Sequence, residues 1–454
     1  MGIIHMRKKL VSMIFQNKIK KGVVLGLLMT ALVLLSVGCE SPIQSKDVTI
    51  GGAAYHPDTT DFVVTRSDFN DYEGLRQLES LEVLDLTALD LTGDEYDAIA
   101  ARVSDQVKIL WNVPLGEKKV PNTRTDWQLS SDELVELAKN VRYFPPITSL
   151  SVEEACPLTE DVAVGMQTLY ETYPELTAQY HSQLYDMEID SGMDELVLSN
   201  RKIKDVEPLR LAVRIFPHIK TYEMCECGLS DDVMGGLREE FPDVTFIWVV
   251  HCGRFSIRTD AQVFSTLEIK DAPEYTEKTF SPLFRYCTEL RALDLGHHGI
   301  VDISEIANLK KLQALDLTDN KIRDISPLSE MKDLRYLVLF NNKVQDLAPI
   351  ENDQNLEDIN IILNKKIKNA TVVTKLPHLK RLFIAYCMIS EEDKDVIAAG
   401  IPEDCEFARR DYGIESGFAS GWRFNERVTA LREAFSHWKK VKEFHSWDDV
   451  VYYD

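Results

Sequence analysis

Residues 312–333 read LQALDLTDNKIRDISPLSEMKD, and residues 334–355 repeat them nearly position for position as LRYLVLFNNKVQDLAPIENDQN. The leucine that opens this unit recurs every 22 residues, at 290, 312, 334 and 356, and again after 23 residues at 379. A unit of this length buries its apolar face only by stacking on similar neighbours, which predicts a solenoid. Such a scaffold offers a long surface to a binding partner.

Each unit follows the pattern LxxLxLxxNxIxDIxPLxxL, and the alternation around LxL predicts a short strand with one buried and one exposed face. The ninth position turns the chain after this strand. We expect the side chain there to hydrogen-bond neighbouring backbone, which forms a structural ladder from coil to coil. The predicted ladder consists of His298, Asn320, Asn342, Asn364, Cys387 and, from an earlier unit, Cys227.

These units resemble the internalin class of bacterial leucine-rich repeats, specifically over about 290–390 and only loosely in the flanking modules. The resemblance implies an α/β leucine-rich repeat solenoid. Its parallel sheet would curve along the concave face, mixed helices and turns would cover the convex face, and β-hairpins would be inserted. Proteins of this kind typically bind other proteins.

A second period of about 70 residues surrounds the 22-residue block. Phe144 and Phe216, in the related strings FPPITSL and FPHIKTY, are 72 residues apart, whereas Phe216 and Leu376 are 160 apart, which is 72 plus four units of 22. Each module is predicted to carry a helix that starts at a hydroxyl N-cap followed by acidic residues. The predicted caps are Thr92, Thr159, Ser230 and Ser390, and one predicted hairpin includes residues 253–260.

The predicted organisation follows from these periods and from the composition of the two ends. It comprises a signal peptide (1–38), a tether and N-terminal cap (39–80), irregular modules of about 70 residues (81–289), four 22-residue repeats (290–378), a final module (379–425), and a C-terminal cap helix and tail (426–454). The helical pattern of the last segment extends over 426–447.

The N-terminal residues 1–38 contain six basic and no acidic residues, and the basic stretch precedes the apolar run VVLGLLMTALVLLSVG, which predicts a secretory signal. The end of that run and Cys39 resemble the bacterial lipobox. This resemblance implies that Cys39 is lipidated and that the protein is extracytoplasmic, anchored to the bacterial cell membrane. A plain transmembrane anchor is the alternative, although the apolar run is shorter than the about 20 residues that a spanning helix needs.

The charge of the chain limits its partners. The net charge is −23, and loss of residues 1–38 takes six basic residues and no acidic ones away, which makes it −29. Nucleic acid is therefore an unexpected partner, because binding it needs a basic surface. Contact with anionic lipid headgroups is unexpected for the same reason, so the lipid on Cys39 would provide the membrane contact.

The outward positions of the predicted strands indicate a binding site. Reading down the repeats, one column is Ala292, Ala314, Tyr336, Asp358 and Arg381, the next is Asp294, Asp316, Val338, Asn360 and Phe383, and the third is Gly296, Thr318, Phe340, Ile362 and Ala385. Exposed aromatic residues beside arginine are typical of binding hot spots. The predicted ligand-binding patch is Tyr336, Val338, Phe340, Ile362, Phe383, Arg335 and Arg381. The alternative is that a hairpin or the C-terminal cap covers these residues.

Other functions have weaker support in the sequence. A carbohydrate or cell-wall glycan receptor is suggested by Trp111, Trp248 and Trp422, on the assumption that they are exposed. An enzyme is less expected because no known catalytic motif occurs, and no cofactor is predicted. The pair Cys225 and Cys227 lacks a partner pair for metal binding, and His298 lies in the ladder register, so no metal site is predicted.

Overall fold

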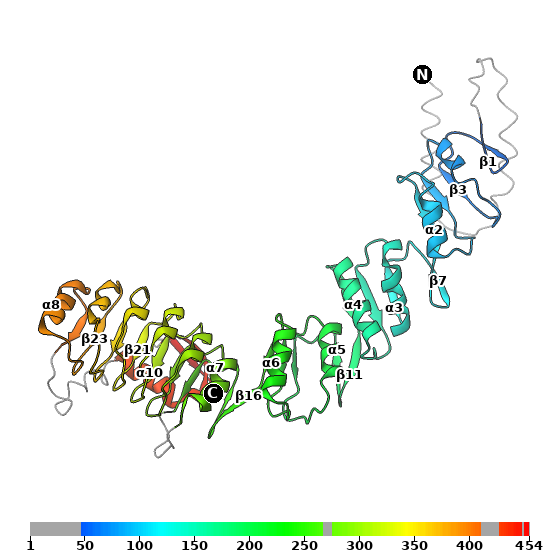
Figure 1. Cartoon of the computed structure of the whole chain (residues 1–454). Coiled ribbons are helices and arrows are strands. Elements are labelled where there is room, and N and C mark those ends of the chain that lie inside the picture. Colours follow the sequence, from blue (N-terminus) through cyan, green and yellow to red (C-terminus); the bar gives the residue numbers. More distant parts are fainter. Residues whose placement is uncertain (1–46, 267–274, 410–425, 447–448, 454) are drawn as a thin grey trace, which may run out of the picture. The chain divides into compact units, whose positions relative to one another are not determined.

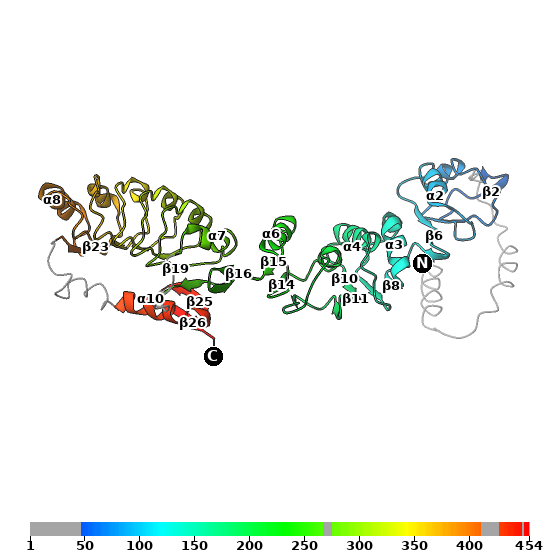
Figure 2. The same cartoon turned by 60° about the horizontal axis from the view of Figure 1, so that its bottom comes forward.

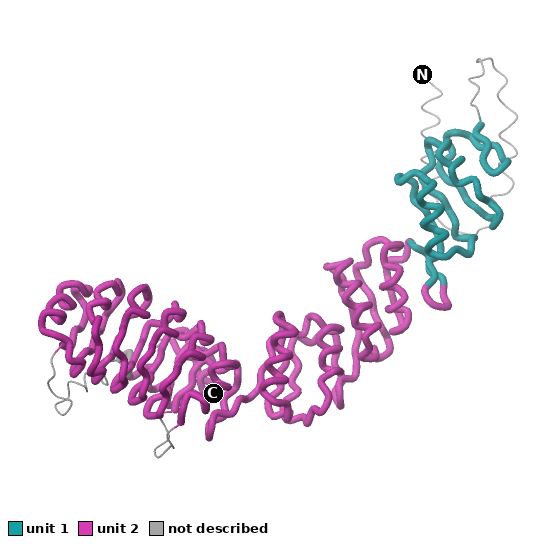
Figure 3. Tube along the Cα trace, in the orientation of Figure 1, with its two compact units in different colours: residues 1–114, 119–122 teal, residues 115–118, 123–454 magenta. Residues whose placement is uncertain are grey.

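The computed structural model describes residues 47–266, 275–409, 426–446 and 449–453. The predicted signal peptide and the lipidation residue Cys39 lie outside these residues. The chain divides into two compact units, one of residues 1–114 and 119–122 and the other of residues 115–118 and 123–454 (Figure 3). None of the helices in the described ranges is long and apolar enough to cross a membrane.

The first unit contains a short antiparallel hairpin and a parallel sheet of three strands in the order β3-β4-β5. The predicted N-terminal cap therefore already contributes a strand to the sheet, since β3 pairs with β4. The N-cap prediction for Thr92 is confirmed: its side chain accepts from the backbone N–H of Glu95, and the Glu95 side chain accepts from the Thr92 N–H. The elements are β1 (Val48–Ile50), β2 (Ala53–Tyr55), β3 (Asp61–Val63), η1 (Gly74–Gln77), β4 (Val83–Asp85), α2 (Gly93–Ala100) and β5 (Lys108–Leu110). The hairpin β6 (Asn112–Leu115) and β7 (Lys118–Pro121) follows.

The second unit begins with two parallel sheets of three strands, each followed by a hairpin (Figure 1). The first sheet and its hairpin comprise β8 (Asp126–Leu129), α3 (Ser131–Asn140), η2 (Val141–Tyr143), β9 (Ser149–Val152), α4 (Glu160–Thr172), β10 (Thr177–Gln179), β11 (His181–Leu184) and β12 (Met187–Asp190). The second comprises β13 (Glu195–Val197), α5 (Glu207–Ile215), β14 (Thr221–Glu223), α6 (Asp231–Glu240), β15 (Thr245–Ile247), β16 (Val249–Cys252) and β17 (Phe255–Arg258). Hydroxyl caps start α4 at Thr159 and α6 at Ser230, as predicted.

A seven-stranded parallel sheet in the order β18 to β24 forms the largest part of the second unit. Its strands are β18 (Val263–Ser265), β19 (Ala292–Asp294), β20 (Ala314–Asp316), β21 (Tyr336–Val338), β22 (Asp358–Asn360), β23 (Arg381–Phe383) and β24 (Glu406–Ala408). The connecting helices stack along one side: α7 (Glu277–Tyr286), η3 (Ser304–Asn308), η4 (Ser326–Glu330), η5 (Ala348–Ile350), η6 (Ala370–Lys375) and α8 (Glu391–Gly400). The leucines that open the 22-residue units are buried between the sheet and these helices.

The parallel strands are divided among separate sheets, whereas the sequence led us to expect one continuous sheet. Hairpin β16–β17 is inserted between β15, the last strand of one sheet, and β18, the first strand of the next. The hairpin turn requires Gly253, whose φ is +64° and whose position leaves no room for a Cβ next to Tyr275. The inserted hairpins are therefore what divides the array.

The C-terminal segment, defined here as residues 426–446 and 449–453, contains α10 (Glu426–Ser436), η7 (Trp438–Lys440), β25 (Val441–Ser446) and β26 (Asp449–Tyr452). The prediction of a helix over 426–447 is wrong beyond Ser436. Val441 and Phe444 belong to a strand that pairs antiparallel with the β-branched and aromatic stretch at 449–452. Figure 2 shows α10, β25 and β26 on the side of the seven-stranded sheet opposite α7 and α8.

Candidate functional site

The ladder side chains make the coil-to-coil hydrogen bonds that their position predicts. Asn342 Oδ1 accepts from the backbone N–H of Ile322 at 3.0 Å, and its Nδ2 donates to the carbonyl oxygen of Leu317 at 2.8 Å. Asn320 and Asn364 repeat both bonds one coil to either side. Each buried amide therefore satisfies backbone groups of the preceding coil, which fixes the spacing of the strands.

The non-Asn members of the ladder differ in chemistry. The Cys387 thiol donates to the carbonyl of Ile361 at 2.9 Å, and Cys227 donates to the carbonyl of Leu198 at 3.1 Å. His298 is buried, and its Nδ1 accepts from the N–H of Tyr275 at 3.5 Å. A thiol can replace only the donor half of the Asn side chain, since sulfur is a weak acceptor.

Two further features of the repeat were not predicted. The residue before the ladder position has a left-handed backbone conformation at His297, Asp319, Asn341, Leu363 and Tyr386, with φ between +51° and +65°. In addition, the aspartate of the DIxPL motif forms a turn before the next short helix: Asp302, Asp324 and Asp346 each accept the backbone N–H of its first residue, two residues on, at 2.8 Å. The Asp-Asn and Asn-Asn pairs at 319–320 and 341–342 are the sequence signal for the first feature, because Asp and Asn tolerate this conformation best.

The strand register confirms the columns read from the sequence. Ala292, Ala314, Tyr336, Asp358 and Arg381 are successive partners across β19 to β23, and the column that starts at Asp294 follows in the same way. All these side chains therefore lie on one face of the sheet, which we call the concave face. The five apolar residues of the predicted binding patch belong to this face.

The prediction of a ligand-binding patch assumed that the concave face is open to solvent. In the structure this face is covered. Tyr336, Val338, Ile362 and Phe383 are at most 5% exposed, and Phe340 is half-buried against them. They form one apolar cluster with Leu431, Ala434, Phe435, Val441 and Phe444 of the C-terminal segment. The second of the two arrangements considered for these residues, burial under the C-terminal cap, is the one that the structure contains.

The cover of the concave face is an amphipathic helix followed by a strand. In α10 the buried residues Leu431, Ala434 and Phe435 stand at i, i+3 and i+4, whereas Arg432, Glu433 and Ser436 are exposed. Trp438 packs edge-on against Phe264 of β18, with ring centroids 4.9 Å apart. The backbone N–H of Phe444 donates to Gln262 Oε1 at 2.7 Å, across 182 residues of sequence.

Both arginines of the predicted patch form ion pairs within the chain. Arg335 Nε donates to Glu357 Oε1 at 2.8 Å, and Lys380 pairs with the other oxygen of the same carboxylate at 2.9 Å. Arg381 Nε contacts Asp358 Oδ1 at 2.5 Å, and both residues are buried. These arginines therefore connect neighbouring strands of the solenoid.

Two carboxylates lie side by side on the concave face. Asp294 and Asp316 are register partners on β19 and β20; Asp294 is 1% exposed and Asp316 is half-buried. Burial and the neighbouring Asp316 raise the pKa of Asp294 to about 7. Burial also raises the pKa of Asp316, against the hydrogen bonds that it accepts from Thr318.

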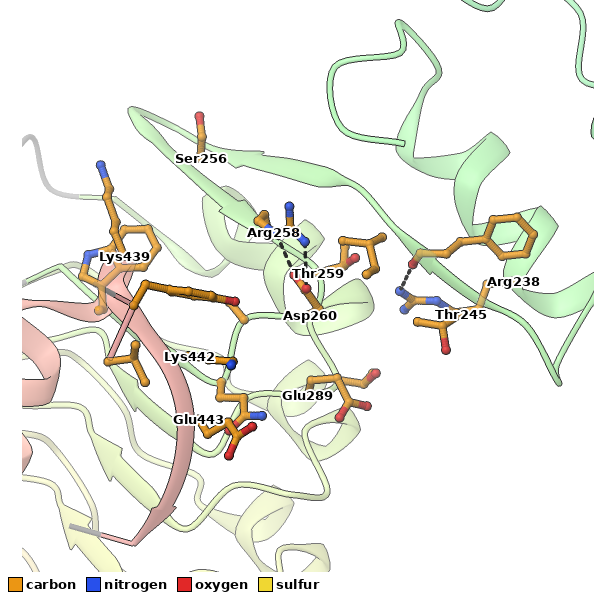
Figure 4. Close-up of a pocket in the computed structure, with 18 of the residues that line it drawn as sticks. Arg238, Thr245, Ser256, Arg258, Thr259, Asp260, Glu289, Lys439, Lys442 and Glu443 are labelled. Carbon is orange, nitrogen blue, oxygen red and sulfur yellow. Dashed lines mark hydrogen bonds and ion pairs between the residues drawn. The ribbon is translucent and has the colours of Figure 1, made fainter. Parts of the chain in front are cut away.

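A groove of about 790 Å³ lies between β15, the β16–β17 hairpin and the C-terminal segment (Figure 4). The arginines that line it are already engaged. Arg258 is bidentate to Asp260 at 3.0 and 2.9 Å, and Arg238 donates to the carbonyls of Tyr286 and Phe246. Lys439 and Lys442 are exposed at its edge. The groove is therefore an open, mixed-charge surface next to the covered face.

The tryptophans that suggested a glycan site are buried, which corrects that part of the sequence analysis. Trp111 is 1% exposed and stacks on Tyr96 with ring centroids 4.3 Å apart. Trp248 is 3% exposed, donates from Nε1 to Asp231 at 2.9 Å and lies under the Arg238 guanidinium. Trp422 lies outside the described residues.

The seven cysteines of the described chain are free thiols, six of them buried. Burial raises the pKa of Cys156 to about 11 and that of Cys252 to about 12, which keeps both thiols protonated and unreactive near neutral pH. Within the ranges that the structure describes, no group of three or more His, Cys, Asp or Glu residues is placed to hold a metal ion.

Comparison with known proteins finds repeats in the same place. A family model of leucine-rich repeats (two copies) matches residues 288–330 and 310–352. No curated protein matches the chain in sequence. Among solved structures, an internalin (InlF) of Listeria monocytogenes is 16% identical, with 81% of this chain and 87% of that one covered and a TM-score of 0.27.

Two other solved structures are similar at the same level. A leucine-rich repeat protein of Leptospira interrogans is 15% identical, with 74% of this chain and 92% of that one covered and a TM-score of 0.27. Internalin C2 of Listeria monocytogenes is 20% identical, with 51% and 83% covered and a TM-score of 0.19. With the repeat match at 288–352 and the stacked parallel strands, the chain is an α/β leucine-rich repeat solenoid with inserted hairpins.

Proposed function

We propose that this chain is a lipid-anchored bacterial surface protein whose leucine-rich repeat scaffold binds another protein through the concave face. The observation that supports this most is that the concave face already binds a peptide segment, the chain's own α10 and β25. Scaffolds of this class typically bind proteins rather than catalyse reactions, and the proposed function requires no catalysis.

The geometry of the cover indicates the chemistry of the partner. A segment that presents apolar side chains at i, i+3 and i+4 fits the apolar cluster of this face, because Leu431, Ala434 and Phe435 belong to that cluster and α10 packs on β18 and β19. Helix-in-groove recognition of this kind uses anchors at those spacings. We therefore propose an amphipathic helix of a protein partner as the ligand, in competition with the C-terminal segment.

The binding proposal can be tested with the segment itself as the probe. A protease site placed within 410–425 of the chain 40–454 lets the C-terminal fragment leave after cleavage, while the solenoid stays intact. A fluorescein-labelled synthetic peptide of residues 426–453 should then exchange onto the cleaved protein, measured by anisotropy, and a scrambled peptide should not. No exchange of the native peptide over the scrambled one would contradict the proposal.

The anchoring proposal rests on the apolar run that ends at Cys39. Expression in a bacterium fed an alkyne fatty acid should label the wild-type protein, and Cys39→Ala should lose the label. Cys156→Ala is the control, because Cys156 is buried in the fold and should not affect labelling. Label that persists in Cys39→Ala would show that the fatty acid is attached elsewhere, which would contradict lipidation of Cys39.

A glycan ligand has less support than a protein ligand. Trp111 and Trp248, which suggested it, are structural core residues, so they offer no face to a sugar ring. The peptide-exchange experiment separates the two classes when soluble cell-wall glycan is added as a competitor. Displacement of the peptide by glycan would favour the carbohydrate alternative.

A further inference from the structure

The carboxylate pair under the C-terminal segment is placed where two negative charges are hard to accommodate. Neighbouring parallel strands are about 4.8 Å apart, so the register partners Asp294 and Asp316 have adjacent side chains. Asp294 accepts hydrogen bonds from Ser265 Oγ at 2.6 Å and from the Gly296 N–H at 2.9 Å. Neither carboxylate forms an ion pair with a lysine, arginine or histidine among the described residues.

The charged and titratable groups around the pair belong to α10, to the turn after β19, and to β21, β22 and β23. Arg432 of α10 and His297, after β19, favour ionised carboxylates, but both are exposed, and His297 Nδ1 lies 3.1 Å from Asp319. Buried Tyr336 belongs to β21, and the buried ion pair Asp358–Arg381 lies beyond it. No compensating cation is therefore buried with the pair in the described part of the chain.

Docking of α10 brings a helix onto β18 and β19, the strand that carries Asp294, and Arg432 of that helix acts on both carboxylates. With the segment in place, burial and mutual repulsion hold the pKa of Asp294 at about 7, so the pair retains one proton across the acidic range. With the segment released, Asp294 would reach water, as the half-buried Asp316 in part already does, and its pKa would return toward about 3.9. The docked state therefore takes up a proton from solvent that the released state does not hold.

We propose that docking of the C-terminal segment on the concave face is coupled to protonation of the Asp294–Asp316 pair, so that the segment is an autoinhibitory cover which a rise in pH loosens. This regulation rests on the proposed function, because it controls access to the same face. It makes acidic surroundings close the face to an external helix and neutral surroundings favour exchange.

The sign and range follow from linkage. Because the pKa of Asp294 is higher in the docked state than in the released state, protonation stabilises the docked state. This stabilisation is complete below about pH 4 and is lost as the pH rises to about 7. Within that window the dissociation constant of the segment rises by up to tenfold per pH unit, and above it the dependence ends.

The cleaved chain and the labelled 426–453 peptide also test this coupling. Anisotropy titrations at steps between about pH 5 and about pH 8 should show the dissociation constant rising up to roughly a hundredfold before it levels. Asp294→Asn keeps the shape, and its oxygen can accept from the Gly296 N–H while its NH2 donates to Ser265 Oγ, but it cannot ionise, so it should bind tightly with a flat profile. Asp316→Asn is the second variant: it removes the repulsion but leaves Asp294 buried, so the pH dependence should persist and move to lower pH.

Asp333→Asn is the matched control, because Asp333 is exposed and lies outside the strands of the concave face, so it should keep the wild-type slope. Circular dichroism melts confirm that each variant is folded. Binding of the peptide with no pH dependence in the wild type, or a slope unchanged in Asp294→Asn, would overturn the coupling and leave the proposed function standing. Absence of peptide binding at every pH would instead overturn the proposed function.

Discussion

Phe435→Ala tests whether the cover on the concave face is an ordered, energetically significant contact. Phe435 is 2% exposed and packs in the cluster with Phe383 and Tyr336. The four large apolar side chains Leu431, Phe435, Val441 and Phe444 together contribute about 6–12 kcal/mol of gross burial, at about 1.5–3 kcal/mol each. The entropy of ordering the segment offsets much of this.

Truncation of a buried phenylalanine to alanine costs about 3–5 kcal/mol. The leucine core and the Asn ladder of the solenoid do not involve Phe435, so the loss falls on docking of the segment rather than on the solenoid. Since every 1.4 kcal/mol is a factor of ten, the segment should open roughly a hundredfold to a few thousandfold more often.

Hydrogen exchange followed by mass spectrometry measures this opening directly. Peptides that cover 429–446 should exchange faster in Phe435→Ala by that factor, while peptides from β20 to β22 should change little. Glu433→Ala is the control, since Glu433 is exposed on the same helix. Equal exchange of 429–446 in wild type and Phe435→Ala would refute packing of the segment on the concave face, because the substitution would then remove no stabilising contact.

Three further predictions concern the scaffold. Asn342→Ala removes the acceptor for Ile322 N–H and the donor to Leu317, so it should lower the free energy of unfolding by about 2–4 kcal/mol in urea titrations, whereas exposed Asn352→Ala should change it by less than about 0.5. Asp324→Ala removes the acceptor for the Ser326 N–H at the start of η4 and should cost about 1 kcal/mol in the same assay; a cost equal to that of Asn342→Ala would contradict the ranking. Because burial raises the thiol pKa values, the buried cysteines should resist iodoacetamide at about pH 8 in the native chain and react after unfolding. Mass spectrometry counts the labelled thiols, and rapid labelling of several thiols in the native chain would contradict their burial.

The repeat architecture could be predicted from sequence because its causes are local. The alternation of LxL defines each strand, and the Asn at the ninth position defines the coil-to-coil ladder. A hydroxyl followed by acids marks the start of α2, α4, α6 and α8. The register of the concave columns follows from these, since neighbouring repeats have equal length. The residue pair Asp294 and Asp316 could therefore be placed side by side before the structure was known.

The cover and the breaks in the sheet could not be predicted in this way. Phe444 contacts Gln262 across 182 residues, and no local pattern encodes such a contact. The amphipathic pattern of α10 is equally compatible with a helix that caps the end of the solenoid and with a helix that packs on the concave face, so the pattern does not distinguish them. The burial of Trp248 could not be predicted because it depends on Arg238 and Asp231, residues on a helix whose packing the sequence does not reveal.

The division of the parallel strands by hairpins has a consequence for how the second unit responds to mechanical load. In a repeat array, cooperativity passes between neighbours through their shared backbone bonds and packing. Hairpin β16–β17 interrupts the backbone bonds between β15 and β18. A pull along the chain should therefore unfold the second unit in steps, and the three-stranded sheets can extend while the seven-stranded sheet stays folded.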